Sequence, residues 1–240
     1  MPRIYKVGGC VRDKILEIDS KDIDFTFVLD DTNMSVEDGF AQMYKWLSDE
    51  GFQIFLSTPD CFTIRAKFPN NHQYEGMVAD FVMARKEVDY IPGTRKPILK
   101  IGTLEDDLVR RDFTLNALAE DEDGKIIDLF GGVDDLRRGY LRTPLDCKVT
   151  FDDDPLRILR AIRFCITKGF YIGAYMDGVI QDYDYETKMK VVSIERIREE
   201  LLKCFKHDTI NTLRVLHEYP SLRNYIFANN ILWLKPTFEK

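Results

Sequence analysis

Acidic residues at alternate positions are the part of this sequence best suited to chemistry. Asp22 and Asp24 stand at the start of an apolar, β-branched stretch that predicts a strand over 23–29. Because residues i and i+2 of a strand point to one face, both carboxylates would meet there, and a cation between them would relieve their repulsion. Asp80, on a further expected strand, is the best candidate for a third carboxylate. The alternative is a solvated strand edge, where Asp is common.

The expected cation is Mg²⁺ or Mn²⁺. The three histidines have no metal-ligand spacing, and the five cysteines are dispersed without a CxxC pair, so oxygen ligands are favoured over a zinc site. Two such ions would activate a ribose hydroxyl and stabilise a leaving pyrophosphate. The dispersed cysteines also predict reduced thiols and a cytoplasmic protein.

Two glycines form a second candidate feature. Gly8 and Gly9 stand between a short expected strand, 4–7, and a short expected helix, 11–16. Glycines there let backbone amides approach a phosphate, and the start of the helix adds positive potential. Arg12 would add a charged donor to a triphosphate. The alternative is a tight turn that needs glycine for backbone reasons alone.

A third feature could distinguish nucleobases. Asp154 and Pro155 predict the start of a helix, and Arg157 lies three residues on, so both charged side chains can face one side. Cytosine and adenine each present an amine donor beside a ring-nitrogen acceptor, which Asp154 and Arg157 complement, whereas uracil and guanine reverse that pattern. Arg160 follows on the same helix as a triphosphate contact or an ordinary ion-paired residue. The alternative is that Asp154 only caps the helix and pairs with Arg157.

Composition limits the possible partners. The net charge is −7, which argues against an indiscriminate nucleic-acid binder. Residues 137–168, however, hold eight basic and four acidic residues, a local charge of +4 that can hold phosphates. No apolar run is long enough to span a membrane, and the first residues lack a signal core.

The pattern of elements predicts an α/β part followed by a helical part. A helix capped by Ser35 and a helix over 108–119 are expected in the first part, and residues 84–103, rich in charges with Pro and Gly, are expected to form a mobile loop. The remaining expected strands are 53–56, 61–68, 77–83 and 125–129. From Asp154 onward the pattern is helical, with a break near 168–175.

These residues fall into blocks that resemble a known family. The stretch from Val7 to Asp13, followed by Asp22-Ile23-Asp24, resembles the first signature of class II tRNA nucleotidyltransferases and bacterial poly(A) polymerases. Four further blocks follow in the family's order. Residues 107–117 resemble the block that contacts nucleotide and ribose, and residues 128–136 resemble the hinge block. Residues 153–164 resemble the base-selecting block, and residues 193–201 resemble the neck-helix block.

The resemblance implies an α/β head with the nucleotidyltransferase fold, a mixed β-sheet flanked by helices, over residues 1–145, and an all-helical neck and short body over 146–240. It implies template-independent addition of C and A, from CTP and ATP, to an RNA 3′ end such as that of tRNA. Asp22 and Asp24 match the family's metal ligands, and Asp80 matches its third acidic position. The residues that match the nucleotide-holding positions are Arg111, Asp112 and Asn116.

Two departures leave alternatives open. Asp153 stands where the family has Glu, and only about 40 residues follow the last block, so the RNA-gripping body looks reduced. The alternatives are poly(A) polymerisation, a catalytically idle RNA-end-binding module, and transfer to a small molecule or protein. A homo-oligomer could also complete the RNA-binding surface, with the apolar residues near the end forming the contact between copies. The alternative is that these residues form ordinary core; they are Leu213, Leu216, Leu222, Ile226, Ile231, Leu232 and Trp233.

Overall fold

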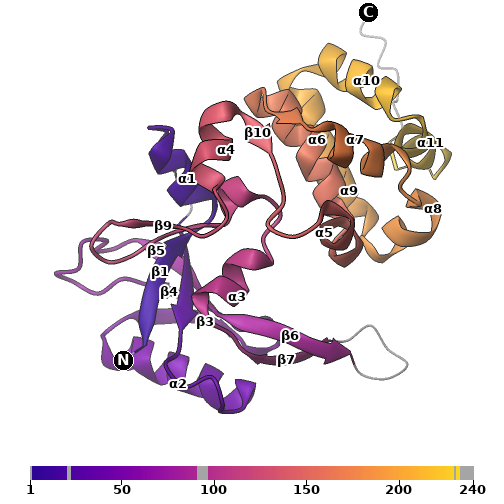
Figure 1. Ribbon diagram of the computed structural model, residues 1–240. Helices are drawn as coiled ribbons and strands as arrows, with labels where there is room; N and C mark the ends of the chain where they lie inside the picture. The colour runs from indigo at the N-terminus through magenta and orange to yellow at the C-terminus, as the bar shows by residue number, and fades with distance from the viewer. Residues whose placement is uncertain (1, 21–22, 91–96, 230, 233–240) are drawn as a thin grey trace, which may run out of the picture. The chain divides into compact units, whose positions relative to one another are not determined.

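The chain folds into two compact units, which divide after Asp134 (Figure 1). The structure, a computed structural model, describes residues 2–20, 23–90, 97–229 and 231–232. The first unit combines strands and helices, and the second is almost entirely helical, as the sequence predicts. The expected boundary after residue 145 falls later than this division. In the described part of the chain, no helix combines the length and the apolarity needed to cross a membrane.

A seven-stranded mixed sheet forms the first unit. Its order is β3-β4-β5-β2-β1-β8-β9, and β2 and β5 run parallel while the other neighbouring pairs are antiparallel. The mixed sheet predicted from the sequence is therefore confirmed. The strands are β1 (Arg3–Val7), β2 (Asp24–Val28), β3 (Gln53–Thr58), β4 (Thr63–Lys67), β5 (Val78–Met83), β8 (Leu118–Glu120) and β9 (Ile126–Asp128).

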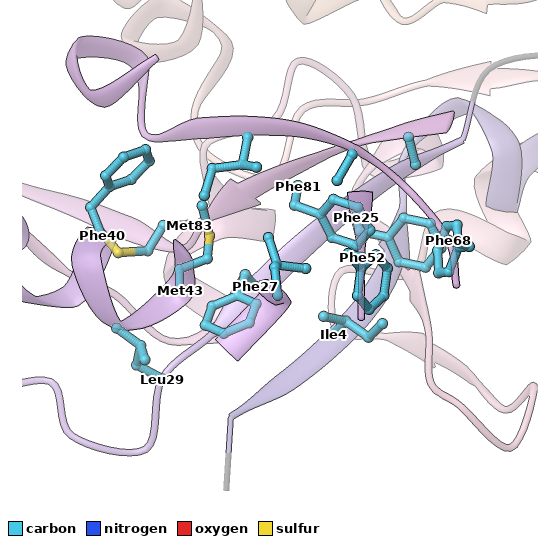
Figure 2. Close-up of a cluster of buried hydrophobic side chains, with 14 of the residues drawn as sticks. Ile4, Phe25, Phe27, Leu29, Phe40, Met43, Phe52, Phe68, Phe81 and Met83 are labelled. Carbon is cyan, nitrogen blue, oxygen red and sulfur yellow. The ribbon is translucent and has the colours of Figure 1, made fainter. Parts of the chain in front are cut away.

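One face of this sheet packs against α2 (Val36–Asp49). Ser35 caps the helix by accepting a hydrogen bond from the Asp38 amide, as expected. Figure 2 shows the cluster of buried hydrophobic side chains in this core. Within it, Phe25 and Phe81 stack with ring centroids 5.2 Å apart. Because side chains alternate along β2, Phe25 points into this core while Asp24 points to the opposite face.

The opposite face packs against α3 (Leu104–Val109). Leu108 of α3 joins Tyr5 and Val7 of β1 in a second buried cluster. Thr26 of β2 donates a hydrogen bond from Oγ1 to Asp107 Oδ2 at 2.9 Å, which ties this helix to the sheet. A third helix, α1 (Gly9–Ile15), follows β1 directly. The face that carries Asp24 is therefore the face on which α3 lies.

The mobile loop expected over 84–103 is wrong for residues 85–90 and 97–101, and residues 91–96 lie outside the described residues. Two strands, β6 (Arg85–Tyr90) and β7 (Pro97–Ile101), pair antiparallel there as a separate ribbon. Charged residues and Pro depress local strand propensity, but cross-strand pairing overrides a weak local preference.

The expected helix over 108–119 is also wrong. After α3 ends at Val109, the chain forms a 3-10 turn, Thr114–Asn116, and then enters β8. Leu115, Ala117, Leu118 and Ala119 are all fully buried. A buried apolar run has no polar face, so its periodicity cannot separate a helix from a strand.

The second unit is built from helices that begin at well-defined caps. Ser193 caps α9 and Asp208 caps α10, each through its side-chain oxygen. The elements are α5 (Cys147–Asp153), α6 (Leu156–Lys168), α7 (Ala174–Gln181), α8 (Tyr185–Lys188), α9 (Ile194–His207), α10 (Thr209–Glu218) and α11 (Pro220–Ala228), with α4 (Gly132–Arg138) at the division and short parallel strands β10 (Tyr140–Leu141) and β11 (Tyr171–Ile172).

Most of the apolar residues near the end are core. Leu216, Leu222, Ile226 and Ile231 are buried, whereas Leu213 is half exposed. Trp233 lies outside the described residues. A partly buried ion pair between Arg163 of α6 and Glu200 of α9, with Nε and Oε2 2.5 Å apart, links the two longest helices of this unit.

Candidate active site

Two of the predicted carboxylates lie side by side. Asp24, the first residue of β2, is the register partner of Asp80 on the parallel neighbour β5. Directly opposite residues of adjacent strands project from the same face, so both carboxylates stand on the α3 side of the sheet. Asp24 is exposed and Asp80 is half buried. Asp22 lies outside the described residues, and its convergence with Asp24 stays a prediction.

The glycine bend lies beside this pair. Val7 of β1 is the register partner of Asp24, and Gly8 follows directly with φ at +77°. Cys10, in the first turn of α1, donates from Sγ to the Val7 carbonyl at 3.3 Å. Burial raises the pKa of the Cys10 thiol, so it stays protonated next to the acidic pair.

Arg111 packs against the bend. A Cβ added at Gly8 would lie 2.7 Å from Arg111 Nη1, so glycine is what admits the guanidinium here. Asp107 Oδ2 accepts from Arg111 Nη2 at 2.9 Å and also from Thr26, which anchors the guanidinium. Among the described residues, Arg111 Nε is the buried side-chain nitrogen without a hydrogen-bond partner. An unpaired buried donor is costly, and an anionic oxygen would satisfy it.

A hydrogen-bonded chain holds three more predicted residues. Arg12 donates from Nη1 to Asn116 Oδ1 at 2.7 Å, and Asn116 donates from Nδ2 to Asp112 Oδ1 at 2.9 Å. Asp13 accepts from the other side of the Arg12 guanidinium. Asp112 and Asn116 are both buried. The structure thus brings Gly8, Gly9, Arg12, Arg111, Asp112 and Asn116 together.

The base-selecting candidates belong to the second unit. Asp154 accepts a hydrogen bond at 3.1 Å from the amide of Leu156, the first residue of α6. Its Oδ2 lies 3.4 Å from Arg196 Nη2, and the Arg157 guanidinium donates to the Thr150 carbonyl at 3.2 Å. Arg160 is half buried on the same helix.

The donor set suits a hard divalent cation. Asp24 and Asp80 offer carboxylate oxygens, the ligands that Mg²⁺ takes in small number together with water and substrate phosphates. Within the described residues, no three His, Cys, Asp or Glu side chains gather closely enough to hold a metal by themselves. The described pair therefore fits an ion that completes its coordination with other oxygens, and it does not fit a closed zinc site.

Sequence reasoning missed the residues that support the site. Asp107 and Thr26 hold Arg111, and Asp13 holds Arg12. The i,i+4 spacing of Asp107 and Arg111 was a usable signal. No local pattern indicated Arg65, whose guanidinium binds both oxygens of Asp80.

Comparison with known proteins agrees with this architecture. Residues 4–142 match the model of the poly A polymerase head domain. The multifunctional CCA protein of Janthinobacterium sp. (strain Marseille) is 31% identical over 239 residues, which cover 98% of this chain and 51% of that protein. The CCA-adding enzyme of Lactobacillus helveticus is 33% identical over 201 residues, 83% of this chain and 45% of that enzyme.

Solved structures show the same relationship. The crystal structure of the Bacillus stearothermophilus CCA-adding enzyme in complex with CTP superposes with a TM-score of 0.69 at 27% identity, covering 92% of this chain and 49% of that one. Fold and sequence together place the protein in the nucleotidyltransferase class. Within that class, the chain belongs to the poly(A) polymerase head-domain family. It spans about half the length of the curated relatives that it matches.

Proposed function

We propose that this chain adds C and A nucleotides, from CTP and ATP, to RNA 3′ ends without a template, with tRNA as the acceptor. Asp24 and Asp80, together with Asp22, would hold Mg²⁺ or Mn²⁺. When bound, the metal ions would lower the pKa of the attacking hydroxyl and balance the charge on the leaving pyrophosphate. The observation that carries the proposal is the adjacency of the Asp24–Asp80 pair to the glycine bend and Arg111.

The chain's own residues would bind and orient the nucleotide. The partly exposed guanidinium of Arg111 would donate to a triphosphate oxygen, while Asp107 keeps it in place. Arg12 would add positive charge, and Asp112 and Asn116 would contact the ribose or base from their fixed positions. Asp154 and Arg157 would read the amine and ring nitrogen shared by cytosine and adenine. A wrong base would leave buried polar groups unpaired at about 1–3 kcal/mol each.

The test uses purified protein, Mg²⁺ and a tRNA transcript that lacks its 3′ CCA. Each labelled NTP is supplied singly and then in pairs, and the products are sized on a gel. Incorporation limited to C and A, and stopping after a few residues, is the expected result. Incorporation of U or G at comparable rates would refute the proposal.

The second candidate is poly(A) polymerisation, which the head-domain match also favours. The same assay separates the two functions. Long A tails with ATP alone, and no use of CTP, would establish polyadenylation instead. Binding of the RNA end with no incorporation of any nucleotide would indicate an idle binding module.

A further inference from the structure

A cationic side chain contacts one of the two described carboxylates, Asp80. Arg65 on β4 is the register partner of Asp80 on β5, and Asp80 is the register partner of Asp24 on β2. Directly opposite residues of neighbouring antiparallel strands point to one face with their Cβ atoms about 4.5–5.5 Å apart. Across the sheet, this face therefore carries one positive charge followed by two negative charges.

The contact between Arg65 and Asp80 uses both carboxylate oxygens. Arg65 Nε donates to Oδ1 at 2.7 Å, and Nη2 donates to Oδ2 at 2.7 Å. Such a bidentate pair fixes the plane of the carboxylate. The Arg65 side chain is 54% exposed and that of Asp80 is 30% exposed. Water screens a pair with this exposure, so it can open at little cost.

We propose that Arg65 is the resident counterion of the Asp24–Asp80 pair and that it lowers the affinity of this pair for divalent cations. Two carboxylates on adjacent strands repel each other, and the guanidinium relieves that repulsion while the metal is absent. A bound divalent cation would take over this task and would be repelled by the guanidinium beside it. The inference rests on the proposed function in one respect: that function is the reason for taking Mg²⁺ or Mn²⁺ as the divalent cation.

Direct metal binding tests the inference without any nucleotide or RNA. The full chain is titrated with Mn²⁺, and the free ion is measured by electron paramagnetic resonance. Arg65→Gln removes the charge and is expected to tighten Mn²⁺ binding about three- to tenfold. Arg65→Lys keeps the charge and should stay close to the wild type.

Two further variants control for indirect effects. Asp80→Asn in the Arg65→Gln background should abolish the gain, because the freed carboxylate is gone. Lys45→Gln opens a different exposed ion pair, with Asp49 on α2, and should leave Mn²⁺ binding unchanged. Circular dichroism checks that each variant is folded.

The outcomes separate this inference from the proposed function. Equal or weaker Mn²⁺ binding by Arg65→Gln, an equal gain in Arg65→Lys, or no binding in any variant would overturn the counterion role. A tightened Mn²⁺ site in a protein that adds no nucleotide would support the counterion role and refute the proposed function. Nucleotide addition by the protein, together with a Mn²⁺ affinity that Arg65→Gln leaves unchanged, would support the proposed function and refute the counterion role.

Discussion

Arg111 occupies the space that a side chain at Gly8 would need. An added Cβ would lie 2.7 Å from Arg111 Nη1, and Gly8 has φ at +77°, a region that L side chains rarely adopt. The bend therefore depends on glycine for two reasons: the backbone conformation and the approach of the guanidinium.

The Gly8→Ala variant is expected to lose nucleotide addition about 10- to 100-fold, because the methyl group would push the Arg111 guanidinium from its place against the bend. Single-turnover rates measure this loss. Gly124→Ala is the matched control, since Gly124 has φ at +78° and no atom within 4 Å of an added Cβ. Gly124→Ala should lose about 1–2 kcal/mol of stability from backbone strain. Gly8→Ala should lose more, because Gly8 has ψ at −133°, outside the left-handed region. Equal activity of the two variants would contradict the role of the Gly8–Arg111 contact.

The Asp24→Asn variant is expected to reduce turnover by at least about 10²-fold with the fold retained, because a proposed metal ligand is lost at an exposed position. Turnover is measured at saturating Mg²⁺ and NTP, and folding is checked by thermal melting. Asp49→Asn, an exposed acid on α2, is the control and should be active. Near-normal turnover of Asp24→Asn would remove Asp24 from the metal site.

The Arg157→Ala variant is expected to blur base choice before it stops catalysis. Loss of one donor, worth about 1–3 kcal/mol, should reduce the preference for CTP over UTP about 5- to 100-fold. Arg160→Ala is the contrasting variant, because loss of the triphosphate contact proposed for Arg160 should weaken CTP and ATP binding alike without admitting UTP. Competition assays with paired NTPs measure both effects, and unchanged selectivity in Arg157→Ala would exclude its role as a base reader.

A partly buried ion cluster around Glu120 predicts acid sensitivity. Burial opposes ionisation of Glu120, but hydrogen bonds from Lys14 at 2.7 Å and Lys6 at 3.0 Å outweigh it and hold the pKa of this carboxyl below 4.5. A carboxyl with a lowered pKa contributes stability above its unfolded-state pKa and loses it as the pH falls through its folded-state pKa. The folded state should therefore weaken progressively below about pH 4.5.

The Glu120→Gln variant measures this contribution. At pH 7 it should cost about 1–3 kcal/mol of unfolding free energy, because both lysines lose their charged partner. The difference from wild type should shrink as the pH falls below 4.5, the ordinary value for this carboxyl. Urea unfolding at several pH values provides the measurement, with Glu50→Gln on the exposed end of α2 as control. A difference that does not change with pH would show that the lysines do not set the ionisation of Glu120.

Much of the fold follows from local patterns in the chain. Alternating apolar residues predict β2 and β5, and Ser35 predicts the start of α2, because side-chain direction and capping are settled within a few residues. Local pattern failed where burial removed the polar face, at Leu115–Ala119, and where pairing overrode propensity, in the β6–β7 ribbon.

The sequence by itself determined which chemical groups this protein possesses: acidic residues near the start of a strand, a glycine pair before a helix, and an Asp–Arg pair at a helix start. Only the tertiary structure decided which of them meet. Asp80 lies beside Asp24, Arg65 binds Asp80, and Arg111 lies against Gly8 because strand register and the packing of α3 join residues that are distant along the chain. Register depends on pairing between whole strands, and no short stretch of sequence contains that information.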